Sequence, residues 1–155
     1  MFKFVAIATS AMALASPALA DLKMPQNLQP LQASQVKDIY VEKSLVFPHF
    51  RYFYKRDGEV TGVSDDPMSF ALGHWTNEKN RFCVDVTWQT KKTEPGFPFQ
   101  ACYDWFTDGT MYWTQISTSS DASLVGKVFQ GNPSVVRDND VVSLLLRKAM
   151  QKLGY

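Results

Sequence analysis

The sequence predicts a mainly β domain of the α+β class. We expect an antiparallel meander of about six strands in three hairpins, forming a curled sheet with a short N-terminal helix and a C-terminal amphipathic helix packed on it. Between residues 50 and 116, apolar and polar residues alternate, and aromatic and β-branched residues are dense. Turn signals divide this stretch, and helical periodicity occurs on both sides of it. Residues 34–155 are therefore predicted to form a single β-rich domain.

The first predicted helix follows Ser34, which is suited to be the N-cap. Val36, Ile39, Tyr40 and Lys43 recur at helical spacing and place one apolar stripe on the helix. The helix is expected to end before Pro48.

Three hairpins are predicted next, two of them with Asp-Gly turns that tolerate the positive φ values of a tight type I′ turn. They pair 51–56 with 59–63 across Asp57-Gly58, 70–76 with 81–88 across 77–80, and 101–107 with 110–116 across Asp108-Gly109. Residues 91–98 contain two prolines and a glycine, so we expect an exposed connection there.

Cys83 and Cys102 are the only cysteines, and we expect them to form a disulfide. Closing a loop of about 20 residues stabilises a fold by about 3 kcal/mol in the chain-entropy model. A metal pair or a catalytic thiol is the alternative, but the pair lacks C-x-x-C spacing. With the two cysteines opposite each other, the register also pairs Phe82 with Tyr103, Val84 with Ala101, Val86 with Phe99 and Arg81 with Asp104, and places Asp85 near Gln100.

After Ser117 a stretch rich in Ser, Thr and Asp interrupts the strand pattern. Asp138 or Asp140 can cap a final helix that runs to about Leu153, with Gly154 as the stop. Its apolar face predicts packing on the sheet, because an isolated helix of this length is marginal in water.

Residues 1–20 have the pattern of a signal peptide, with Lys3, an apolar run and a small-x-small site that predicts cleavage between Ala20 and Asp21. The alternative is a retained anchor helix, which needs about 20 apolar residues. Residues 21–33 are then an extended leader. We therefore expect a periplasmic or secreted protein without a transmembrane segment in the mature chain.

The charge of the chain argues against nucleic acid as a partner. It has 16 Lys and Arg against 15 Asp and Glu, and removal of Lys3 balances the two. The signs are interspersed, so no basic surface for nucleic acid or an anionic membrane is expected.

Short motifs between residues 31 and 116 resemble a family of proteobacterial secreted proteins, domain of unknown function 995. They are the Asp-Gly turns, Gly73-His74-Trp75, Phe82-Cys83 and Cys102. The resemblance implies an extracytoplasmic single domain and carries over no catalytic residue. The C-terminal helix lies outside the part that resembles the family.

The chain lacks a phosphate-binding loop, a dinucleotide fingerprint and an HExxH helix, so we expect no cofactor, metal site or catalytic residue. A Ser64–His49–Asp65 triad has no nucleophile elbow to support it. The alternative function is a small envelope hydrolase acting on cell-wall or exported polymer. In that hypothesis His74 and a carboxylate, Asp85 or Asp104, act as acid and base.

Aromatic density is the unusual feature of the strand region, and strict alternation cannot bury every ring on one face. One explanation is that the helices and the leader cover the second face. The other is a concave aromatic surface for an envelope protein, glycan or peptide. We favour a non-enzymatic binding or interaction module. Its candidate ligand-binding residues are Tyr52, Tyr54, Trp88, Trp105, Tyr112 and Trp113.

Overall fold

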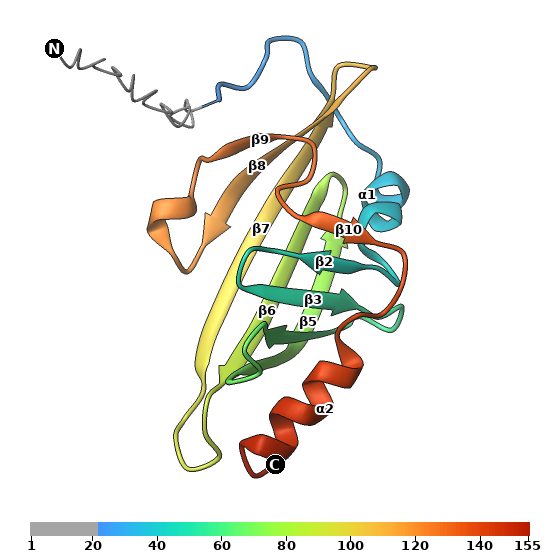
Figure 1. Cartoon of the computed structure of the whole chain (residues 1–155). Coiled ribbons are helices and arrows are strands. Elements are labelled where there is room, and N and C mark those ends of the chain that lie inside the picture. The colour runs from blue at the N-terminus through green and yellow to red at the C-terminus, as the bar shows by residue number, and fades with distance from the viewer. Residues whose placement is uncertain (1–21) are drawn as a thin grey trace, which may run out of the picture.

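A computed structural model describes residues 22–155, so the predicted signal peptide and its cleavage site lie outside the described residues. The described chain forms a 10-stranded antiparallel sheet with two helices (Figure 1). The strands are β1 (Gln29–Pro30), β2 (Ser44–Val46), β3 (Phe50–Tyr54), β4 (Glu59–Ser64), β5 (Phe70–Glu78), β6 (Arg81–Gln89), β7 (Phe97–Thr107), β8 (Tyr112–Ser119), β9 (Val128–Gln130) and β10 (Val135–Arg137). The helices are α1 (Ala33–Tyr40) and α2 (Ser143–Lys152), and a 3-10 turn spans Ala122–Leu124.

The strand order is β10-β2-β3-β4-β5-β6-β7-β8-β9, with β1 added to β7. In a flat sheet the two edge strands, β10 and β9, would lie about 38 Å apart at about 4.8 Å per strand. Residues 131–134 alone join these two edges, and that length of chain spans at most about 18 Å. The sheet must therefore curl, and it forms a half-barrel (Figure 1).

The curled sheet confirms the predicted fold class, although it has ten strands where about six were expected. The three predicted hairpins are present as β3–β4, β5–β6 and β7–β8. Both Asp-Gly turns are longer than the expected two residues, because the pairs that flank them are Tyr54 with Val60 and Thr107 with Tyr112. The strands that the sequence missed are β1, β2, β9 and β10, each of two or three residues. Segments this short do not show a period-two pattern. Strands β1, β2 and β9 each pair with a longer strand, and β10 pairs with β2.

Two connections also differ from expectation. Strand β5 continues to Glu78 and β6 starts at Arg81, so a tighter turn replaces the loop expected over 77–80. Strand β7 begins at Phe97, inside the expected connection. Strand β7 pairs with β8 only from Ala101 onward. Pro98 precedes this stretch, where β7 has a free edge, so a residue without a backbone N–H is tolerated there.

The cystine and its register are confirmed. Cys83 and Cys102 are bonded, and β6 and β7 pair Phe82 with Tyr103, Val84 with Ala101, Val86 with Phe99 and Arg81 with Asp104. The Arg81 guanidinium donates to both carboxylate oxygens of Asp104, at 2.7 and 2.8 Å. The Gln100 amide donates to Asp85 at 2.6 Å. These polar pairs and the cystine share the outer, convex face, while the apolar pairs face inward.

Helix α1 fills the concave side of the sheet at one end. Val36 and Tyr40 are buried as predicted, and the Tyr40 ring stacks on Phe82 with centroids 3.7 Å apart. The helix starts two residues earlier than expected, so Ser34 is not its N-cap. Gln32 takes that position, and the Gln35 side chain accepts its backbone N–H at 2.9 Å. The helix ends at Tyr40, because Val41 is extended, and so Lys43 lies outside it.

Helix α2 covers the opposite face, as the amphipathic pattern predicted. Val142 and Ala149 pack with Val63 of β4 and Phe70 of β5 in a second, outer core. The Asp140 carboxylate accepts the backbone N–H groups of Val142 and Ser143, at 2.8 and 2.9 Å, and so caps the first turn. The two faces of one sheet are thus each covered by one helix.

Candidate functional site

Two pockets open at opposite ends of the concave face. Because neighbouring strands are antiparallel, the turns after β2, β4 and β6 meet at one end, and those after β3, β5 and β7 meet at the other. Between the pockets the interior is solid, since Tyr40, Tyr54, Phe82 and Trp105 pack there in edge-to-face and stacked pairs. Burial raises the pKa values of Tyr40 and Tyr54 well above the ordinary value, so these phenols stay protonated.

The first pocket, here called the aromatic cleft, has a volume of about 320 Å³. Its rings come from Phe50, Tyr52, Trp88, Phe97 and Phe99, and His49, Ser64 and Ser69 complete the lining. The Trp88 indole N–H donates to the Tyr52 hydroxyl at 3.1 Å, so the indole's only donor is already used. The wall of the cleft therefore presents mainly carbon to a ligand.

A glycine makes room for the wall of the cleft. Gly62 of β4 lies opposite Tyr52 of β3, and a Cβ added there would be 2.6 Å from the Tyr52 ring. The ring can lie against the neighbouring strand only because position 62 has no side chain. Phe97, at the start of β7, stands at the mouth with 53% of its surface exposed. The cleft thus combines a fixed wall with an exposed ring at its entrance.

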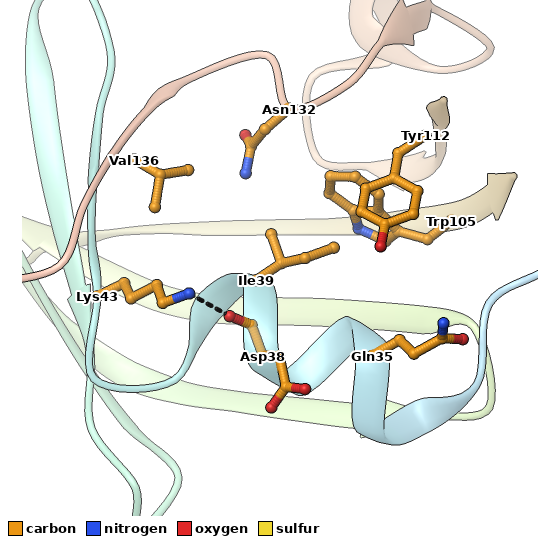
Figure 2. Close-up of a pocket in the computed structure, with 8 residues that line it drawn as sticks. All are labelled: Gln35, Asp38, Ile39, Lys43, Trp105, Tyr112, Asn132 and Val136. Carbon is orange, nitrogen blue, oxygen red and sulfur yellow. Dashed lines mark hydrogen bonds between the residues drawn. The ribbon is translucent and has the colours of Figure 1, made fainter. Parts of the chain in front are cut away.

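The second pocket, here called the gap pocket, lies where the two edges of the sheet approach each other and has a volume of about 420 Å³. Figure 2 shows its lining, which comes from α1, the segment between α1 and β2, the ends of β7 and β8, strand β10 and the segment between β9 and β10. The residues are Gln35, Asp38, Ile39, Lys43, Trp105, Tyr112, Asn132 and Val136. Polar and apolar groups are mixed here, in contrast to the aromatic cleft.

The structure distributes the six candidate residues over four places. Tyr52 and Trp88 meet in the wall of the aromatic cleft, and Trp105 and Tyr112 meet in the gap pocket. Tyr54 is 2% exposed and lies in the core between the pockets. Trp113 is on the outer face, where it pairs with Phe106 of β7. The opposite orientations of Trp105 and Phe106 follow the expected alternation, and α1 covers part of the inner face.

The histidine and carboxylates of the hydrolase hypothesis are on the outer face. His74 of β5 pairs in register with Glu59 on one side and Asp85 on the other. No hydrogen bond of the His74 side chain occurs within residues 22–155. Asp104 is held by Arg81 in a two-point ion pair, so both of its carboxylate oxygens already accept hydrogen bonds from the guanidinium.

Comparison with known proteins gives one match. The family described as Protein of unknown function (DUF995) matches residues 4–150. The chain belongs to the DUF995 family. No curated protein and no solved structure matches it. The resemblance expected over residues 31–116 is thus confirmed, and the match extends into the C-terminal helix.

Residues 22–155 of this DUF995 chain contain neither a cluster of metal ligands nor a membrane-spanning helix. No group of His, Cys, Asp and Glu side chains is arranged to hold a metal ion in that range. None of the helices in the same range has the length and apolarity to cross a membrane.

Sequence reasoning missed the polar half of the gap pocket. Lys43 was expected in the helix, and Asn132 stood in a segment without periodicity. For Phe50 and Phe97 the signal was present, since both are aromatic residues beside hairpin turns. Which turns share an end of the sheet follows from the antiparallel order, so these residues were within reach of prediction.

Proposed function

We propose that this DUF995 protein is a non-enzymatic binding module of the periplasm or cell exterior, and that the aromatic cleft holds an apolar small molecule. The observation that carries the proposal is the cleft itself, in which the exposed Phe97 joins two buried rings, Tyr52 and Trp88, and two half-buried phenylalanines. A volume of about 320 Å³ falls within the usual range of small-molecule pockets. The cystine supports an oxidising compartment.

The chemistry of the wall sets the class of ligand. Phe50 lies edge-on to both Trp88 and Tyr52, with centroids 5.8 and 5.3 Å apart, and Tyr52 is tilted against Trp88. Such contacts fix the rings before a ligand arrives, so little order is lost on binding. Because the indole N–H is already paired, binding to the wall is driven mainly by removal of apolar surface from water, which contributes about 25 cal/mol per Å². A ligand with a neutral hydrocarbon chain or ring therefore suits this wall better than a charged ligand does.

The test uses N-phenyl-1-naphthylamine, a neutral apolar fluorophore that brightens when it leaves water. We expect saturable binding of one molecule per chain. Phe97→Ala should weaken binding about fivefold, since removing a half-exposed ring costs about 1 kcal/mol of burial. Leu144→Ala is the matched control, because Leu144 is 58% exposed on α2 and lies outside the cleft. Equal affinities of the two variants, or binding that does not saturate, would contradict the proposal.

A hydrolase remains the second candidate because His74 stands between Glu59 and Asp85 on neighbouring strands. Release of dye from dye-labelled cell-wall polymer separates the two functions. The binding proposal predicts no release by the purified chain. Release that disappears in His74→Ala would establish the hydrolase instead, whereas His74→Ala should leave fluorophore binding unchanged.

A further inference from the structure

We infer that the gap pocket is a second binding site, which takes an N-acetylated sugar by its acetamido group. It lies at the other end of the sheet from the aromatic cleft and does not depend on the function proposed for that cleft. The first observation is an unpaired donor. The side-chain nitrogen Nδ2 of Asn132 is buried and has no hydrogen-bond partner.

The orientation of the Asn132 amide is fixed by its neighbour Ser134. The oxygen Oδ1 accepts the Ser134 backbone N–H at 3.0 Å and its hydroxyl at 2.7 Å. A backbone N–H can only donate, so the atom facing it is the oxygen and the nitrogen faces the other way. In Figure 2 the nitrogen points into the pocket, between Val136 and Ile39. A buried donor without an acceptor is costly, and a ligand acceptor would remove that cost.

The charges around the pocket favour a neutral acceptor over an anion. Lys43 is the only cation among the lining residues, and its amino group already donates to the Asp38 backbone carbonyl. It also lies 3.9 Å from the Asp138 carboxylate. Asp38 adds a second negative charge to the lining. With its one cation balanced in this way, the pocket offers an anion no net attraction. The carbonyl oxygen of an amide is neutral, so it can accept a hydrogen bond from Asn132 without a free cation in the pocket.

The apolar groups supply the rest of the fit. Ile39 and Val136 flank the Asn132 nitrogen and suit the methyl group of an acetamido substituent (Figure 2). Tyr112 is 45% exposed at the rim and offers a ring face against which a sugar ring can stack. Val136 belongs to the edge strand β10, which pairs only with β2. An outward shift of this side chain therefore gives the ligand access to the Asn132 nitrogen without breaking a second strand pairing.

A titration of the ¹⁵N-labelled chain tests this site through the side-chain amide signal of Asn132. N-acetylglucosamine should move one amide proton downfield in a saturable way, as expected when an unpaired donor gains an acceptor. Glucose, which lacks the acetamido group, should bind at least about tenfold more weakly, which corresponds to about 1.4 kcal/mol.

Asn132→Asp is the matched variant, since it keeps the oxygen that Ser134 uses and replaces the donor with a second acceptor. We expect N-acetylglucosamine binding to be lost in this variant while the remaining amide spectrum stays that of the folded chain. Lys148→Gln, an exposed change on α2, should bind as the unmodified chain does.

The inference would be overturned by no saturable response to N-acetylglucosamine, an equal response to glucose, unchanged binding by Asn132→Asp, or a stronger response to sodium acetate. N-acetylalaninamide carries the same amide chemistry without a sugar ring. If it binds as tightly as N-acetylglucosamine, the site recognises peptide amides and the sugar assignment fails. Binding of N-phenyl-1-naphthylamine to the aromatic cleft is measured in every variant as well, and it is independent of the gap pocket.

Discussion

Removal of the cystine should lower the free energy of unfolding by about 3 kcal/mol. Cys83 and Cys102 are 19 positions apart, and for a closed loop of about 20 residues the chain-entropy relation gives about 3 kcal/mol at 25 °C. Both residues are half-buried on the outer face, so Cys83→Ala with Cys102→Ala opens no cavity in the aromatic core. For the described chain this loss corresponds to a fall in Tm of roughly 10 °C.

Urea denaturation followed by tryptophan fluorescence measures the effect, because Trp75 and Trp105 are buried and report on the core. The unmodified chain, after reduction, should unfold at the same urea concentration as the double variant. Thiol titration of the unreduced chain should find no free sulfhydryl. If the oxidised chain and the double variant have the same midpoint and slope, the cystine does not stabilise the β6–β7 pair and the reasoning fails.

Two further perturbations test the packing of the sheet. Gly73→Ala should destabilise the fold by about 1–3 kcal/mol, since the added Cβ would lie 2.0 Å from the Asp85 carbonyl oxygen, a backbone atom of β6. Thr76→Ala, on the outer face of the same strand, should change stability by less than about 0.5 kcal/mol in the same urea assay, and equal losses would contradict the clash. Burial raises the pKa of Tyr103 to about 12, while the unfolded chain ionises near pH 10. The folded phenol therefore keeps its proton longer, and the free energy of unfolding should fall as pH rises from about 10 to 12. Tyr103→Phe should lessen this fall, and an unchanged alkaline slope would refute the assignment.

The two pockets differ in a way that makes their tests independent. The aromatic cleft depends on rings that are already paired with one another, whereas the gap pocket depends on a donor that has no partner. Phe97→Ala should therefore affect only the apolar fluorophore, and Asn132→Asp only the sugar. A variant that abolishes both would indicate loss of the fold.

Local chemistry allowed the sequence to predict most of the architecture. Asp57-Gly58 and Asp108-Gly109 mark two hairpins correctly, because both glycines adopt the positive φ that each turn needs. The expected type I′ geometry was wrong, since neither aspartate has a positive φ. Two cysteines and the alternation of side chains then set the β6–β7 register residue by residue. The helical stripes identified α1 and α2, because burial of one face is what makes a short helix stable.

The tertiary structure alone decided which aromatic residues can meet a ligand. Tyr52 and Tyr54 have the same place in the pattern of one strand, yet one lines the aromatic cleft and the other is sealed beneath Tyr40 and Phe82. The pairing of the short strands also depends on residues far apart in the chain. So does the gap pocket, which is lined by both Lys43 and Asn132. Alternation assigns a side chain to a face of the sheet, but only curling and the position of α1 determine whether that face is filled or open.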